Sequence, residues 1–212
     1  MPPTSHHIGT RKDRPRSAPT AHGFTLLELL IVIAIVAIVA ALLFGGAKTF
    51  QEKAKRIKCV GNLKTIGTGV LQNTADLQGK WPAVYDGKPW YTVLNQSYGV
   101  TTNTFFCPSA RNPAFTADRI SYGYNITLGG GAVSAPPKYP LSVTRKLSEL
   151  IIVADSIDTG SQQYYLVNGD PPRMGTRHEG KANIFWGDGH LTAESRAALT
   201  NVKYWKPDYV EP

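Results

Sequence analysis

Residues 23–46 read GFTLLELLIVIAIVAIVAALLFGG, and this stretch decides how the rest of the chain is interpreted. Between Phe24 and Phe44, only Thr25 and Glu28 are polar. As a helix these residues extend ~30 Å, which is about the thickness of the hydrocarbon core of a bilayer. No small-residue cleavage site follows the apolar run, which argues against a cleaved secretory signal. The sequence therefore predicts a membrane-spanning helix.

Glu28 is the one charged residue of this run. An ionised carboxylate in hydrocarbon costs at least ~2.5 kcal/mol, so it requires a partner or a place near the membrane surface. Two interpretations follow from the residues alone. The side chain of Glu28 either reaches the interface from the end of the helix, or pairs with a cation inside the membrane.

The net charge of +8 lies on the two flanks of the apolar run. Residues 1–23 carry +3 and residues 47–64 carry +5, whereas residues 65–212 carry only +1. The C-terminal part lacks the basic surface typical of nucleic-acid-binding domains, so no nucleic acid is expected as a partner. Because both flanks are basic, charge alone does not orient the segment in a membrane.

Apolar residues continue beyond the run at gaps of three and four, which predicts an amphipathic helix with one apolar face. This stripe consists of Ala47, Phe50, Ala54, Ile57, Val60, Leu63, Ile66 and Val70. The basic residues between them are interpreted as a solvated face near lipid head groups rather than as a ligand site. The second half of the long helix is thus expected to pack on a globular domain.

The remainder of the chain alternates short β-rich stretches with turns rich in Gly, Pro and Asn. Strands are predicted at Tyr91–Leu94, Ile120–Ile126, Leu150–Ala154, Gln163–Val167, Asn183–Trp186 and Leu191–Glu194. The sequence Gly187-Asp188-Gly189 between the last two suits a tight hairpin turn. The predicted fold class is α+β: a long N-terminal helix, with its first half in the membrane, packed on a small antiparallel β-sheet.

The chain contains two cysteines, Cys59 and Cys107, and neither lies in a metal-binding spacing. If the domain lies outside the cytoplasm, a disulfide between them is chemically natural, with a contribution of ~3–4 kcal/mol. The alternative is two buried free thiols.

The start of the apolar run resembles the class III signal of type IV prepilins and type II secretion pseudopilins. The matching residues are Gly23, Phe24, Thr25 and Glu28, behind a basic leader. The resemblance implies that a prepilin peptidase cuts between Gly23 and Phe24 on the cytoplasmic face, and that the new N-terminus is methylated. The α-amino group of Phe24 would then lie one helical turn from Glu28, so the two charges can pair within one chain or between neighbouring chains during assembly.

A second resemblance lies near the C-terminus. His178, nine intervening residues, and then Asp188-Gly189 match a motif found in a large bacterial group of prepilin-type proteins. That group also carries a Cys-x-x-Asn-Leu-Lys element, here residues 59–64, and a Cys-Pro pair, here residues 107–108. The resemblance implies a pilin-like role and does not define a more specific function.

Four residues are candidate metal ligands: Asp155, His178, Asp188 and His190. Imidazole with carboxylate suits zinc or manganese, and carboxylate with loop carbonyls suits calcium. Because some secretion pseudopilins bind calcium in C-terminal loops, a divalent metal such as calcium is the cofactor candidate. No compact ligand spacing is present, however. The structural alternative is that Asp188 caps its own turn and His178 bonds a neighbouring loop.

The resemblance implies a structural subunit, not an enzyme, that assembles into a pilus or a type II secretion pseudopilus. It divides the chain into a leader (1–23), a transmembrane and assembly helix (24–46), an amphipathic continuation (47–76) and a globular pilin-like domain (77–212). The implied partners are copies of the chain, other pilin-like subunits, prepilin peptidase, an inner-membrane assembly platform and lipids. The implied location is the inner membrane, spanned once, with a cytoplasmic N-terminus and a periplasmic domain, and later a filament.

Two alternatives stay open. A membrane-anchored, metal-dependent enzyme would use the region of His178 and Asp188, although the sequence shows no nucleophile elbow, zincin motif or P-loop. A surface-displayed binding module would contact a polymer such as a glycan through Trp81, Trp90 and Tyr91, although such aromatics are more often core residues.

Overall fold

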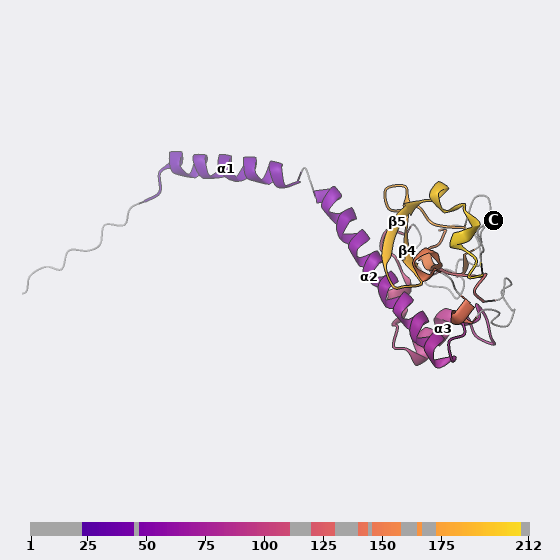
Figure 1. The fold of residues 1–212 in the computed structure, drawn as a ribbon. Helices are drawn as coiled ribbons and strands as arrows, with labels where there is room; N and C mark the ends of the chain where they lie inside the picture. The colour runs from indigo at the N-terminus through magenta and orange to yellow at the C-terminus, as the bar shows by residue number, and fades with distance from the viewer. Residues whose placement is uncertain are drawn as a thin grey trace, which may run out of the picture. The chain divides into compact units, whose positions relative to one another are not determined.

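In the computed structural model the chain forms two compact units, residues 1–47 and residues 48–212 (Figure 1). The structure describes residues 23–44, 47–110, 120–129, 140–143, 146–157, 165–166 and 173–208. The leader, residues 1–22, and the Gly45-Gly46 pair lie outside the described residues. The predicted domain boundaries stay predictions.

Helix α1, Leu26–Phe44, is the described part of the first unit. Its sequence is dominated by Leu, Ile, Val and Ala, with no Gly or Pro to interrupt it. The window Leu26–Leu43 is long and apolar enough to cross a membrane, and none of it is buried against protein. An apolar helix that is exposed all round requires a nonpolar environment, which is either lipid or other helices.

The second unit begins with helix α2, Ala47–Asp76, followed by helix α3, Trp90–Ser97. The strands are β1 (Tyr122–Asn125), β2 (Ile151–Asp155), β3 (Tyr165–Leu166), β4 (Lys181–Trp186) and β5 (Leu191–Ser195). Short 3-10 turns lie at Thr102–Phe105, Leu141–Val143, Leu147–Glu149, Ala197–Leu199 and Val202–Tyr204. The α+β prediction is confirmed.

The sheet has five strands in the order β3-β1-β2-β4-β5. All neighbouring pairs are antiparallel except β1 with β3, which is parallel. Strands β4 and β5 form a hairpin in which Phe185 pairs with Leu191. The turn between them is closed by a hydrogen bond from the Gly189 amide to the Trp186 carbonyl, 2.9 Å, and Gly189 adopts a φ of +90° that favours glycine. The hairpin predicted at residues 187–189 is confirmed.

The two faces of the sheet bury different sets of side chains. On β4, Phe185 joins the core formed with α2 and α3, whereas Ile184 and Trp186 join a second core. This alternation follows from the two-residue period of a strand. The second core is completed by Leu199 and Trp205 from the C-terminal turns. Helices therefore cover one face of the sheet, and the C-terminal segment covers the other.

The predicted apolar stripe of α2 does not stay on one face. Its steps average about 3.3 residues, less than the 3.6 residues of a helical turn, so the stripe winds around the helix. Leu63, Ile66 and Val70 are buried in the core, whereas Phe50 is 71% exposed and Ile57 is 73% exposed. Only the C-terminal part of the predicted face packs on the domain.

The prediction of a strand at Tyr91–Leu94 is wrong, because these residues lie in helix α3. Their aromatic and β-branched side chains favour a strand by propensity. The buried residues, however, are Trp90, Tyr91 and Leu94, a spacing that places all three on one side of a helix. Burial of this side against the core decides the conformation, and Pro89 sits at the position before the first turn.

Gly61 and Gly67 of α2 differ in how much space surrounds the position of a Cβ atom. A Cβ on Gly67 would lie 2.3 Å from the ring of Phe185, so the helix backbone rests directly on β4. A Cβ on Gly61 would meet nothing within 4 Å. We expect Gly67→Ala to destabilise the domain by ~1–3 kcal/mol through overpacking. We expect Gly61→Ala to stabilise it by up to ~1 kcal/mol through helix propensity.

Urea unfolding of the full chain in detergent micelles, followed by tryptophan fluorescence, measures both changes. Gly61→Ala is the matched control, because it adds the same methyl group to the same helix. Equal effects of the two substitutions would contradict the close contact of Gly67 with β4.

Candidate functional site: the N-terminal helix and the buried His178 cluster

The first turn of α1 is held by Thr25 and Glu28. The Oε2 atom of Glu28 accepts hydrogen bonds from the amide and the hydroxyl of Thr25, both at 2.9 Å. In return the amide of Glu28 donates to Oγ1 of Thr25 at 3.2 Å. This is a capping box, which satisfies amide donors that an apolar environment would leave unpaired. Sequence analysis missed this role, although the Thr-x-x-Glu spacing was the signal for it.

The predicted cleavage site lies directly before this cap. Gly23 and Phe24 precede the helix and have no regular secondary structure. The side chain of Phe24 is exposed, and nothing lies within 4 Å of a Cβ built on Gly23. Among the described residues, therefore, none buries Gly23 or Phe24.

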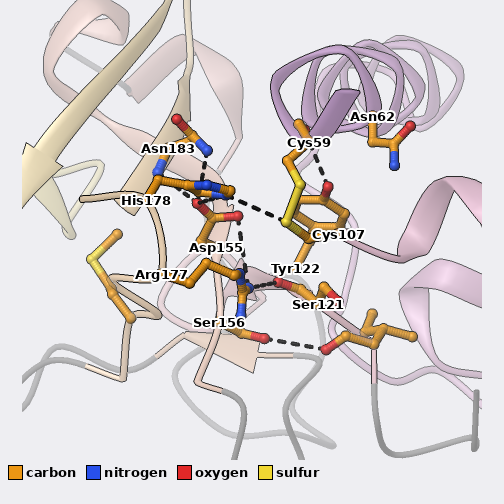
Figure 2. Close-up of polar contacts among 12 residues, drawn as sticks. Cys59, Asn62, Cys107, Ser121, Tyr122, Asp155, Ser156, Arg177, His178 and Asn183 are labelled. Carbon is orange, nitrogen blue, oxygen red and sulfur yellow. Dashed lines mark hydrogen bonds and ion pairs between the residues drawn. A yellow bond between two sulfur atoms is a disulfide. The ribbon is translucent and has the colours of Figure 1, made fainter. Parts of the chain in front are cut away.

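The second site is a buried polar cluster next to α2, and Figure 2 shows its residues. Cys59 of α2 is joined to Cys107 by a disulfide, with a Cα–Cα distance of 4.9 Å. The ring of His178 lies against this bond, with Nε2 3.3 Å from Sγ of Cys107. The hydroxyl of Tyr122 donates to the carbonyl of Cys59 at 3.1 Å. These contacts join α2, the loop after Phe105, strand β1 and the segment before β4.

Asp155, at the end of β2, is the carboxylate of this cluster and is completely buried. Its Oδ2 atom accepts hydrogen bonds from the amide of Asn183 at 2.7 Å and from its side-chain Nδ2 at 3.0 Å. The same oxygen lies 3.6 Å from Nε2 of His178. Arg177 supplies the positive charge, with Nη2 3.7 Å from Oδ1 of Asp155 and 2.6 Å from the Ser121 carbonyl that accepts its hydrogen bond. A buried carboxylate is tolerated because these groups surround it.

His178 is positioned by a tight turn. Its amide and carbonyl exchange hydrogen bonds with Lys181, at 3.3 and 3.0 Å, across Glu179 and Gly180. Both residues of the turn have positive φ, 55° and 76°. This geometry matches a two-residue turn that leads into a strand, and it directs the ring of His178 toward the disulfide (Figure 2).

The family described as a prokaryotic N-terminal methylation motif matches residues 19–44. The chain is 42% identical over 53 residues to the type IV major pilin protein PilA of Myxococcus xanthus (strain DK1622). The N-terminal segment is therefore similar to prokaryotic N-terminal methylation motifs. That alignment covers 25% of this chain and 24% of the pilin, and no solved structure matches the chain.

The prepilin-type segment thus includes Gly23, Phe24 and Glu28, the three residues predicted to serve cleavage, methylation and assembly. The roles of these residues stay predictions. The match does not reach Asp155 or His178, so the C-terminal cluster is interpreted from its own geometry.

The four predicted metal ligands do not form one site. The structure brings Asp155 together with His178, and Asp188 together with His190, as two pairs. Among the described residues, the one group of three or more ligand-type side chains is Cys59, Cys107 and His178, and its cysteines are joined in the disulfide. Disulfide sulfurs are not the thiolates that bind zinc. The structure offers no support for a metal held by the four predicted residues.

The geometry of Asp188 matches its structural alternative. Its Oδ1 atom accepts hydrogen bonds from the amide of His190, 3.1 Å, and from the ring Nδ1 of the same residue. The His190 ring stacks on Trp186, with ring centroids 5.5 Å apart. Asp188 thus caps the β4–β5 turn through a local hydrogen bond.

The aromatic residues proposed to contact a polymer lie in the core. Trp81, Trp90 and Tyr91 are all buried, and Trp90 packs edge-on against Phe105 with ring centroids 6.1 Å apart. They therefore form no binding surface for a glycan.

The disulfide gives a prediction for the stability of the globular domain. Cys59→Ser together with Cys107→Ser opens a loop of 48 residues, and we expect this to reduce the free energy of unfolding by ~3–4 kcal/mol. Urea unfolding measures the change. Intact-mass analysis without reduction should show the wild-type chain two hydrogens lighter than its reduced form. An unchanged mass on reduction would contradict the pairing.

His178 gives a pH prediction. Burial, and then the charges of Arg177 and Arg56, lower the pKa of His178 from 6.5 to about 4. Between these values the unfolded chain binds a proton that the folded chain does not. The free energy of unfolding therefore has its full value above pH 6.5, and the protonation of His178 in the unfolded chain reduces it as the pH falls toward 4. We expect His178 to account for a loss of about 3 kcal/mol in the free energy of unfolding across this window.

The test measures the free energy of unfolding of the wild type and of His178→Asn at a pH above 6.5 and at a pH near 4. The difference between the two proteins in pH dependence is the contribution of His178. His190→Asn is the matched control, because His190 is exposed. If His178→Asn keeps the full pH dependence of the wild type, His178 is not its source.

Proposed function

We propose that this chain is a structural subunit, pilin or pseudopilin, that assembles into a filament through its N-terminal helix. The observation that carries the proposal is helix α1 behind a prepilin-type signal. Its window Leu26–Leu43 is wholly apolar apart from Glu28, and no part of it is buried within the chain. Such a surface is stable in lipid, and after extraction it is stable only when like helices cover it.

The proposed processing site is the peptide bond between Gly23 and Phe24. Prepilin peptidase removes residues 1–23, and the amino group of Phe24 is methylated. The new ammonium group lies one helical turn from the carboxylate of Glu28, close enough for the two charges to pair. Between neighbouring helices the same pair sets the register, because a shifted helix leaves both charges unpaired in an apolar bundle.

The proposed location before assembly is the inner membrane, which α1 spans once with the globular domain on the periplasmic side. An oxidising compartment suits the Cys59–Cys107 disulfide. The proposed partners are copies of this chain, other pilin-like subunits, the peptidase and an inner-membrane assembly platform. Head-to-tail packing of such subunits produces an open filament, either a pilus or a secretion pseudopilus.

N-terminal sequencing of the membrane-associated form tests the proposal. The expected result is a chain that begins with methylated Phe24. A chain that still begins with Met1 in its native host would contradict it. Deletion of residues 1–45 separates this function from those of an enzyme or a binding module: a filament subunit loses its function, whereas a site on the domain keeps its activity.

A further inference from the structure

The first turns of α2 expose large apolar side chains among basic ones. Phe50 is 71% exposed and Ile57 is 73% exposed, and Lys53 and Lys58 are also exposed. These four residues are called the juxtamembrane patch. Single exposed apolar residues are ordinary on protein surfaces, but two on one helix between cations form an amphipathic segment.

The patch faces away from the domain. Phe50 and Ile57 are seven residues apart, which is about two helical turns, so they lie on the same side of α2. Cys59 and Ile66, which are buried in the core, lie on the opposite side of the helix by the same geometry. Beside Ile57, a groove of about 560 Å³ opens between Lys53, Arg56, Val60 and Glu179. The patch therefore continues into an apolar surface edged by positive charge.

The length of the chain limits what this patch can reach. If α1 spans the membrane, as the proposed function requires, Phe50 follows the end of the span at Leu43 by seven residues. Seven residues reach at most ~25 Å even when fully extended, so the start of α2 lies near the membrane surface. Residues 48–58 carry five basic residues and one acidic residue, Glu52. This charge is complementary to anionic lipid head groups.

We propose that the juxtamembrane patch binds an anionic lipid surface. Phe50 and Ile57 insert between head groups, while Lys53 and Lys58, on either side of them, contact lipid phosphates. This contact holds the start of α2 against the bilayer while the subunit is stored, and it covers apolar side chains that extraction exposes. The inference rests on the proposed membrane span of α1.

The test uses Phe50→Trp and lipids with brominated acyl chains, which quench tryptophan fluorescence only at close range. Trp81, Trp90, Trp186 and Trp205 are buried in the domain, so wild-type fluorescence is a stable baseline. The full-chain variant is reconstituted into phosphatidylcholine vesicles and into mixed phosphatidylcholine–phosphatidylglycerol vesicles. We expect quenching of the introduced tryptophan to be about twofold stronger in the anionic vesicles.

Charge variants test the lysines. In the Phe50→Trp background, Lys53→Gln with Lys58→Gln is expected to abolish the difference between the two vesicle types. The matched control is Lys181→Gln with Lys206→Gln, which removes two exposed lysines elsewhere on the same domain and keeps the difference.

The outcomes separate this inference from the proposed function. A chain that fails to float with neutral vesicles shows that α1 does not span, which overturns both. A chain that floats, but whose introduced tryptophan is quenched equally in both vesicle types, overturns the lipid contact alone. Shielding of that tryptophan from aqueous iodide only at high protein density would show that a second copy covers the patch, which also overturns the lipid contact.

Discussion

If the proposed processing and assembly hold, we expect the replacement of Glu28 by alanine to leave the chain cleaved after Gly23 but to exclude it from filaments. Cleavage is expected to continue, because this substitution leaves Gly23 and Phe24 of the proposed processing site unchanged. Assembly is different, because the new ammonium of Phe24 then has no carboxylate to compensate it in an apolar bundle. An uncompensated buried charge costs ~3–5 kcal/mol, enough to reduce incorporation by more than a hundredfold.

The measurement is the ratio of filament-associated to membrane-associated subunit, determined by immunoblot after shearing. Two variants separate the charge from the helix cap, because the carboxylate of Glu28 also accepts the hydrogen bonds of Thr25. Glu28→Gln retains a side-chain acceptor and is expected to fail like alanine. Thr25→Ala weakens the cap by only ~1 kcal/mol and is expected to assemble. Assembly of Glu28→Gln at the wild-type level would show that the charge is not required.

Replacing Asp155 by alanine is expected to have the largest effect on the stability of the domain. Asp155 is completely buried and accepts two hydrogen bonds from Asn183, while its charge compensates Arg177. Removal of the Asp155 carboxylate leaves the backbone amide and the side-chain amide of Asn183 without their acceptor. It also leaves the buried guanidinium of Arg177 without this compensating charge. Breaking a buried pair in this way costs ~3–5 kcal/mol, a large part of the stability of a typical domain.

Asp188→Ala is the matched control, because Asp188 carries the same charge in a side chain that is 39% exposed. Its pairing with His190 is screened by water, so we expect a loss below ~1 kcal/mol. Asp155→Asn keeps the shape of the side chain and should fall between the two. Urea unfolding of the three variants measures the differences. Similar losses for Asp155→Ala and Asp188→Ala would contradict the structural role of the buried cluster.

The elements that could be predicted from the sequence are those that local pattern determines. Helix α1 follows from an uninterrupted apolar run, and the β4–β5 hairpin follows from Gly187-Asp188-Gly189 between two β-rich stretches. Helix α3 could not be predicted in this way, because its residues favour a strand by propensity and become helical through burial of one side. The contact of Gly67 with Phe185 likewise depends on where the helix meets the sheet.

The candidate site also has a part that could be predicted from local sequence and a part that depends on packing. The residues of the N-terminal signal are adjacent in sequence, so their pattern was visible without a structure. The predicted metal set joined Asp155, His178, Asp188 and His190 by residue type alone. The structure separates them, because strand register buries the first two and leaves the last two exposed at a turn.

By itself, the sequence determined the resemblance to an N-terminal methylation motif, the apolar helix and the α+β class, because each depends on patterns among neighbouring residues. Only the tertiary structure decided that His178 lies against the disulfide and beside Asp155. The ring of His178 meets a sulfur 71 residues away, and the Asp155 carboxylate meets an amide 28 residues away. Contacts at such separations depend on how helix and sheet pack together, and no local periodicity specifies that packing.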